Sequence, residues 1–303
     1  MFLALTGQTG RRHRAPATRR PRRDHRPDDG RPADLDTRLI SAVAGAPPPD
    51  TGASPLGATL AFAWRVLLKI RHVPEQLLDA TLFPIMFTLM FTYVFGGAMI
   101  GSPEAYLRYA LPGILAQTIV FMTMYTAVTL NTDLGQGVFD RFRSQPIWRP
   151  APLVGALLGD TLRYSIASAF VIGIATLIGY RAPGGLGGLA GAVALLLVFC
   201  FALSWLWLIV GLTVRTPAAV MGASTMILFP LTFVSSAFAP PGTMPGWVRE
   251  FVTVNPVTLL VEAARGLLDG APDTGDVALV LGISGAMTAV LAPIALRLYS
   301  RRS

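Results

Sequence analysis

Residues 188–213 read GLAGAVALLLVFCFALSWLWLIVGLT and decide the fold class of this chain. The stretch contains no Asp, Glu, Lys, Arg or His, and it exceeds the about 20 residues that an α-helix needs to cross the hydrocarbon of a bilayer. Further apolar runs of similar length lie on both sides of it, at about 79–99, 109–130, 159–180, 218–239 and 277–297. We therefore predict an all-α membrane protein with six transmembrane helices.

The composition points to the same class. Of the 303 residues, 52% are hydrophobic and only 14% are charged, whereas about a quarter of the residues in a soluble domain are charged. The formal charge is +8, but ten of the 24 arginines lie between Arg11 and Arg38 and are not spread over a folded surface. We read this basicity as a topology signal and expect no nucleic-acid partner. The single cysteine, Cys200, leaves no disulfide framework and no thiolate metal site.

The positions of arginine and lysine predict the orientation of the spans. With six spans, 20 of these residues fall on the side of the two termini and four fall on the opposite side, leaving out Arg163 at a span edge. Because loops rich in positive charge stay in the cytoplasm, both termini are predicted to be cytoplasmic.

The chain before the first span divides into two parts. Residues 1–52 mix Arg, Asp, Pro and Gly without an apolar period, which predicts a disordered cytoplasmic tail ahead of a transmembrane domain over 53–303. The tail is either a long leader or misassigned start, or a basic arm that contacts lipid headgroups or a partner. Residues 56–72 place charged and apolar side chains on opposite helical faces, which predicts an interfacial helix on the inner leaflet.

A longer outer connection is predicted between the last two spans, over residues 240–276. The sequence PPGTMPGWVREF indicates a Pro/Gly turn and then a short helix that carries Trp247 at interface depth. The sequence NPVTLLVEAARGLLDG predicts a second, half-buried helix. We expect these re-entrant or interfacial helices to cap the pore. On the same side, Gly184 and Gly188 are either a close-packing motif or a flexible approach to an outer loop.

Residues suited to enzyme chemistry are missing from the predicted spans. The three histidines, His13, His25 and His72, all precede the first span, and the sequence has no GxxxxGK(S/T) phosphate loop. We therefore predict that the chain is not an enzyme and has no metal site, no catalytic residue and no cofactor of its own. If transport is driven by ATP, hydrolysis belongs to a separate polypeptide.

Ionisable residues are predicted only at span edges. Asp79, Asp160 and Arg163 are assigned to the cytoplasmic ends of their spans. Ion-driven carriers usually need buried carboxylates or histidines, so this placement counts against proton antiport, although Na⁺ held by carbonyl groups stays possible. Asp160 and Arg163 share one helical face, as either a local ion pair or a gate contact.

The cytoplasmic segment 131–149, NTDLGQGVFDRFRSQPIWR, ends in a compact acidic, basic and aromatic cluster. On a helix Phe139 and Phe142 share one face, and Asp140 and Arg143 form a second pair. Such a membrane-parallel helix suits docking to a partner. The alternative is a solvated loop whose basic residues serve topology alone.

Four segments make the chain resemble the daunorubicin-resistance branch of ABC-2 type exporter permeases. They are EQLLDATLFPIMFTLMFTYVFGG (75–97), LPGILAQT (111–118), LGQGVFDRFRSQPI (134–147) and FPLTFVSSAFAPPGTMPGWVREFVTVNPVT (229–258). The resemblance covers roughly residues 56–303, and the tail before it has no counterpart in the family pattern.

The resemblance implies a homodimeric permease in the bacterial inner membrane, with two ATPase subunits that bind ATP and Mg. It implies export of a small amphipathic compound. The cluster then becomes the coupling helix that seats in the ATPase, with Phe139, Asp140, Arg141, Phe142 and Arg143 as its contact residues.

Uncharged polar residues within the spans are the candidates for the pore lining, and they are Gln117, Thr118, Thr123, Thr126, Ser224 and Thr232. Several rival functions remain. A lipid or polysaccharide precursor can replace a drug-like substrate. An ion-driven secondary transporter would work without an ATPase, and a membrane scaffold would bind a partner without moving solute.

Overall fold

The computed structural model describes residues 86, 88–95, 102–136 and 151–302. The chain divides into two units, Met1–Asp50 and Thr51–Ser303, and every described residue lies in the second. The predicted tail, the predicted interfacial helix at 56–72, most of the predicted first span and the coupling residues Phe139 to Arg143 lie outside the described residues.

The described secondary structure is helical, with turns and short linkers between the helices. A π-helix, η1 (Phe91–Phe95), and a 3-10 turn, η2 (Pro241–Thr243), accompany the α-helices. The α-helices are α5 (Pro103–Gly135), α7 (Ala151–Leu177), α8 (Gly185–Thr213), α9 (Pro217–Phe233), α10 (Gly246–Val254), α11 (Pro256–Asp269) and α12 (Thr274–Arg302).

Three of these helices begin with a capping residue followed by proline. The pairs are Ser102–Pro103, Thr216–Pro217 and Asn255–Pro256, and each capping side chain accepts a hydrogen bond from a backbone N–H of the first turn. Proline suits this position because its missing N–H has no helical partner there. α11 ends at Gly270, which has a φ of 75° that favours glycine.

Four described helices, α5, α7, α8 and α12, are long and apolar enough to cross a membrane. α10 and α11 pass the same test together but meet at a bend of 74°, as a broken span or a re-entrant pair would. α9 has 17 residues, and its linker begins at Val234, so the last six residues of the predicted span 218–239 are not helical. The all-α class is thus confirmed, whereas the count of six spans stays a prediction.

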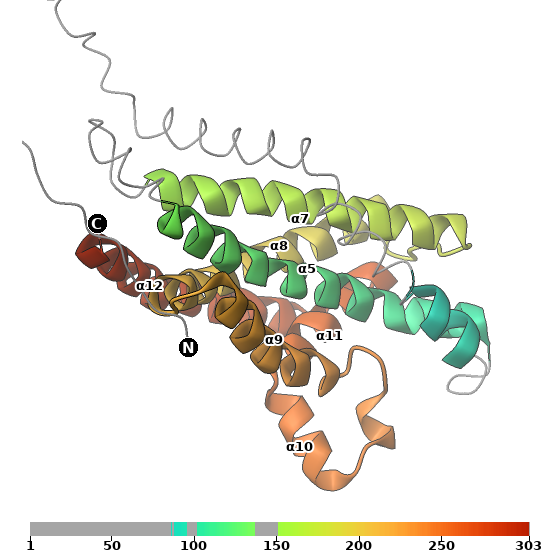
Figure 1. Ribbon diagram of the computed structural model, residues 1–303. Coiled ribbons are helices and arrows are strands. Elements are labelled where there is room, and N and C mark those ends of the chain that lie inside the picture. The colour runs from blue at the N-terminus through green and yellow to red at the C-terminus, as the bar shows by residue number, and fades with distance from the viewer. Residues whose placement is uncertain (1–85, 87, 96–101, 137–150, 303) are drawn as a thin grey trace, which may run out of the picture. The chain divides into compact units, whose positions relative to one another are not determined.

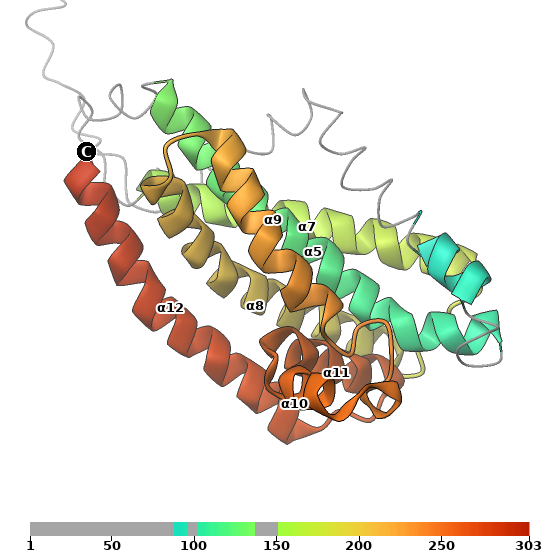
Figure 2. The same ribbon diagram turned by 60° about the horizontal axis from the view of Figure 1, so that its bottom comes forward.

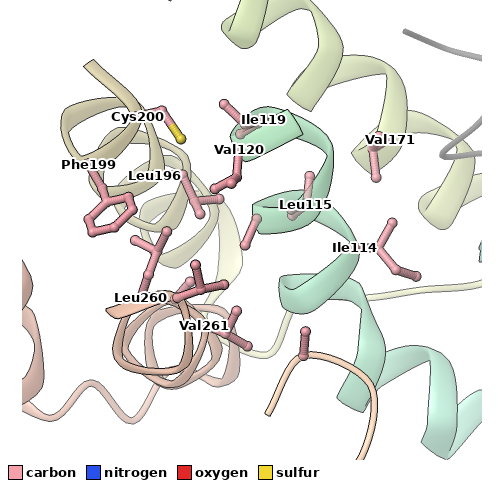
Figure 3. Packing of buried hydrophobic residues seen from close by; sticks show 14 of the residues in the cluster. Ile114, Leu115, Ile119, Val120, Val171, Leu196, Phe199, Cys200, Leu260 and Val261 are labelled. Atoms are coloured by element: carbon pink, nitrogen blue, oxygen red, sulfur yellow. The ribbon is translucent and has the colours of Figure 1, made fainter. Parts of the chain in front are cut away.

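α5 lies at the centre of this arrangement, packed against α7, α8, α9 and α11 (Figures 1 and 2). Buried residues make up 78% of the apolar window of α5 but only 11% of that of α12, which packs along α8 at the edge of the bundle. Figure 3 shows Ile114, Leu115, Ile119 and Val120 of α5 between Leu196, Phe199 and Cys200 of α8, Leu260 and Val261 of α11, and Val171 of α7. The more deeply buried helix is therefore the one with neighbours on several sides.

A second apolar cluster shows which helix ends lie together. It contains Leu130 near the end of α5, Leu153 near the start of α7, Leu212 at the end of α8 and Tyr299 near the end of α12. This grouping is the one that an alternating up-and-down order of spans requires, with residues 137–150 connecting α5 to α7 at this end.

Gly184 and Gly188, at the start of α8, were predicted to be either a close-packing motif or a flexible approach to a loop, and their distances to the backbone of α11 favour the first. A Cβ atom on Gly184 would lie 2.4 Å from the Leu267 carbonyl oxygen, and one on Gly188 would lie 2.1 Å from the same atom. The pair therefore packs α8 against the end of α11, as the small-residue reading predicted.

Candidate functional site

The predicted pore-lining residues are all buried within the protein, on α5 and α9. Thr118, Thr123 and Thr232 donate their hydroxyl protons to carbonyl groups of their own helices. Gln117 Nε2 and Ser224 Oγ have no hydrogen-bond partner among the described residues. The six residues do not form one lining in the single chain, and their role in a pore stays a prediction.

Gln117 lies on the side of α5 that faces α9. It is four residues after Gly113, which touches the backbone of Ala237 beyond the end of α9, and seven before Met124, whose sulfur lies 3.8 Å from the Thr225 hydroxyl. α9 presents Ser224 and Thr232 from its buried face. The contact between the two helices therefore holds two buried polar atoms, Gln117 Nε2 and Ser224 Oγ, without a hydrogen-bond partner among the described residues.

Polar side chains from three helices meet inside the bundle. We call them the buried polar cluster, and its members are Thr126 of α5, Asp160, Arg163 and Tyr164 of α7, and Ser204 of α8. The Thr126 hydroxyl donates to Asp160 Oδ2 at 2.5 Å and lies 3.1 Å from the Tyr164 hydroxyl. The Tyr164 hydroxyl in turn lies 3.2 Å from that of Ser204. Hydrogen bonds therefore cross from α5 to α7 and from α7 to α8.

The cluster contains a buried ion pair. Arg163 Nη2 lies 3.0 Å from Asp160 Oδ1, and the two side chains are only 10% and 8% exposed. The same nitrogen donates to the Met122 carbonyl of α5 at 3.3 Å, and the guanidinium carbon lies 5.7 Å from the centre of the Tyr164 ring. The local ion pair that the i, i+3 spacing predicted is confirmed.

The pair lies further from the start of its helix than the predicted span 159–180 placed it. α7 begins at Ala151 and not near 159, so Tyr164 is the central residue of the 27-residue helix and the ion pair lies next to it. The helix also includes the uncharged segment APLVGALL, residues 151–158. The length of the apolar run predicted that the span begins later, at about 159. A carboxylate is therefore present near the middle of a helix that is long and apolar enough to cross a membrane, and it is paired with an arginine.

A second polar group lies at the opposite end of α5, and we call it the α5–α11 clasp. Its members are Arg108, Tyr109, Ser236, Arg265 and Asp269. Arg265 Nη2 donates to the carbonyl groups of Tyr109 and Ser236, and its guanidinium carbon lies 4.1 Å from the centre of the Tyr109 ring. Arg108 Nε lies 2.8 Å from Asp269 Oδ1.

The clasp satisfies the backbone where α9 has ended. The hydroxyls of Tyr106 and Tyr109 donate to the carbonyl groups of Phe238 and Ser236, in the stretch that the sequence predicted to be helical. Nonhelical backbone at membrane depth needs such partners because lipid offers none. Tyr180 of the α7–α8 linker is also buried in this region, and burial together with the nearby Asp269 carboxylate raises its pKa.

Asn131 and Asn255 bind the ends of other helices, a role that the sequence did not predict. The Asn131 amide donates to the carbonyl groups of Gly211 and Val214 at the end of α8. The Asn255 amide donates to those of Leu231 and Val234 at the end of α9. Each asparagine therefore fixes a helix end that is distant in sequence. The Asn–Pro pair at 255 was a local signal for a helix start, but no local signal reveals its long-range partner.

Among the described residues, no three His, Cys, Asp or Glu side chains gather closely enough to hold a metal ion. Ion pairs instead join Arg108 to Asp269, Arg163 to Asp160 and Arg265 to Glu262.

Comparison with known proteins gives a consistent assignment. Residues 57–268 match the family described as ABC-2 type transporter. The chain is 45% identical over 251 residues to the daunorubicin resistance ABC transporter permease protein DrrB1 of Streptomyces coeruleorubidus, covering 83% of this chain and 89% of that one. It is 22% identical to the probable doxorubicin resistance ABC transporter permease protein DrrC of Mycobacterium tuberculosis, over 71% and 78% of the two chains. It is also 22% identical to the putative transport permease ycf38 of Cyanophora paradoxa, over 67% and 71%.

Proposed function

The chain belongs to the ABC-2 type transporter family, and from this premise we propose that it is the membrane permease of an ATP-driven exporter for amphipathic, drug-like or natural-product compounds. The observation that carries the proposal is the 45% identity, over most of both chains, to a permease named for daunorubicin resistance. The chain itself is a transport subunit and not an enzyme, because ATP and Mg bind to a separate ATPase subunit.

The proposed assembly is a homodimer with two ATPase subunits, in a bacterial cell membrane with both termini in the cytoplasm. The exposed apolar face of α9 supports the proposal of a homodimer. α9 packs mainly on α5 and leaves Met226 81% and Phe229 54% exposed. A second copy would cover this apolar surface, and a shift of α9 away from α5 would bring the buried Gln117 and Ser224 within reach of a substrate between the copies.

Coupling is proposed to run through the segment between α5 and α7. The ends of these helices, Gly135 and Ala151, lie on either side of the predicted coupling residues Phe139 to Arg143. Docking of that segment in the ATPase would move both helices when ATP binds and is hydrolysed. Closure on one side and opening on the other would then export the compound.

The test is efflux of a fluorescent amphipathic dye from vesicles that contain the chain and its candidate ATPase. The test variant is Phe139→Ala/Arg143→Ala. The matched control is Trp247→Ala/Arg181→Ala, which also removes one aromatic and one arginine side chain, from exposed positions at the opposite end of the helices. We expect ATP-dependent efflux and co-purification of the ATPase to be lost in the test variant and kept in the control.

Other outcomes separate the rival functions. Efflux without any ATPase would reject the ABC mechanism in favour of a secondary transporter, for which Asp160 is the carboxylate to examine. ATPase binding without efflux of any dye, lipid or polysaccharide precursor would favour a scaffold. Efflux of a lipid-linked precursor alone would replace the drug-like substrate.

A further inference from the structure

We propose that the buried polar cluster clamps α5 to α7, so that the two helices that flank the coupling segment move as one lever. This inference rests on the proposed function, because it assigns the cluster a role in passing motion from the ATPase to the transport path. Asp160 and Arg163 act here as positioning residues and need not touch the substrate.

The buried polar cluster lies at the same distance from the coupling segment on both helices. Thr126 precedes Gly135, the last residue of α5, by nine positions, and Asp160 follows Ala151, the first residue of α7, by nine positions. At 1.5 Å per residue, both lie about 13 Å from the ends that the segment connects. The hydrogen bond between them therefore joins the two helices at equal height.

Both charged residues of the cluster bind groups on α5. The carboxylate of Asp160 accepts from Thr126 of α5, and Arg163 reaches across to the Met122 carbonyl of the same helix. If α5 slid along α7 by one turn, both charged groups would lose a partner in a medium of low dielectric constant. Leaving a buried charge uncompensated is strongly unfavourable. The pair therefore resists relative motion of these two helices in particular.

The contact between α5 and α9 differs from that between α5 and α7, because no ion pair takes part in it among the described residues. Val220, Ser224, Leu228 and Thr232 form the buried face of α9, and Thr232 bonds to its own Leu228 carbonyl. The polar contact from Thr225 to Met124 is a long one to sulfur, at 3.8 Å. Along the helices themselves, no charged group bridges α5 and α9 among the described residues, so their contacts can be remade after a shift of α9. The tyrosine bonds to Ser236 and Phe238 instead hold the linker beyond its end. We therefore assign the movement that accompanies transport to the α5–α9 contact and rigidity to the α5–α7 contact.

The experiment measures both contacts by pulsed electron paramagnetic resonance in the complete complex. In a Cys200→Ala background, spin labels at Gly135→Cys and Leu162→Cys report α5 against α7, and labels at Gly135→Cys and Ala218→Cys report α5 against α9. We expect the first distance to be the same with and without a nonhydrolysable ATP analogue, and the second to shift. A nucleotide-dependent change in the first distance would overturn the lever.

The variant Asp160→Leu/Arg163→Met tests whether the ion pair is what holds α5 to α7. An apolar pair can pack in place of a buried ion pair without unfolding the protein. We expect the α5–α7 distance distribution to broaden and dye efflux per ATP hydrolysed to fall about fivefold or more. Thr161→Val is the matched control, because its hydroxyl bonds to its own helix, at the Leu157 carbonyl, and does not cross to α5.

The two readouts keep this inference separate from the proposed function. The α5–α7 distribution can be measured in the chain alone, so a failure of ATP-dependent efflux in the wild type rejects the exporter without deciding the clamp. An unchanged distribution and unchanged efflux per ATP in the double variant would reduce the cluster to ordinary packing and reject the inference.

Discussion

The buried polar cluster and the α5–α11 clasp both join α5 to its neighbours through arginine, tyrosine and carboxylate groups, but they differ in exposure and in what they bind. The Arg163 and Asp160 side chains are 10% and 8% exposed, whereas those of Arg108 and Asp269 are 54% and 32% exposed. Similar chemistry is therefore placed once inside the bundle and once at its end.

Polar groups therefore serve two purposes in this protein: they join helices to one another, and they provide hydrogen bonds for nonhelical backbone. In the cluster, side chains from three helices bond to one another, so the removal of Arg163 leaves the buried Asp160 carboxylate without its cation. In the clasp, Arg265 and the tyrosines bind backbone carbonyl groups of the linker after α9. They substitute for helical hydrogen bonds, whereas the more exposed Arg108–Asp269 pair of the clasp can be partly replaced by water.

The largest effect is expected from breaking the buried ion pair on one side. Arg163→Met leaves the Asp160 carboxylate buried without its cation, which costs about 3–5 kcal/mol of unfolding free energy. Thermal unfolding of the purified protein in detergent measures this loss. The double variant Asp160→Leu/Arg163→Met should recover most of the stability, and equal melting of the single and double variants would contradict this account.

An intermediate effect is expected from glycines that let backbones touch at the two ends of α5. A Cβ atom on Gly113 would lie 2.2 Å from the Ala237 carbonyl oxygen near the clasp, and one on Gly211 would lie 2.7 Å from that of Ala127. Each alanine substitution forces a backbone shift that costs about 1–3 kcal/mol, more at Gly113. Gly222→Ala is the control, since nothing lies within 4 Å of its added Cβ. Unfolding temperatures should fall in the order of these distances.

The smallest effects are expected at the clasp, and they should differ between its arginines. Arg265→Gln removes the contact with the Tyr109 ring, the bonds to two carbonyl groups and the ion pair with Glu262, at a cost of about 1–2 kcal/mol. Arg108→Gln breaks an exposed ion pair worth about 0–1 kcal/mol, which added salt weakens further. Denaturation at low and high salt measures both. A larger loss for Arg108 than for Arg265 would show that the exposed pair, and not the carbonyl bonding, stabilises the clasp.

Local sequence patterns predicted the parts of this protein that depend on helix chemistry. Apolar length located α8 and α12 closely, and the Pro/Gly turn followed by Asn–Pro located α10 and α11. The i, i+3 spacing predicted the Asp160–Arg163 pair. These features follow from the solvent and from caps and turns within a few residues, which a single sequence displays. The coupling residues Phe139 to Arg143 stay a prediction, as do the six pore-lining residues.

What the sequence determined by itself is the all-α membrane class, the position of most helices and, through resemblance, the family. What only the tertiary structure decided is the depth of Asp160, the division of the predicted pore residues among several contacts, and the pairing of Asn131 and Asn255 with distant helix ends. The physical reason is that apolar length and capping act between residues near in the chain. A buried hydrogen bond depends instead on which helices pack together and at what height.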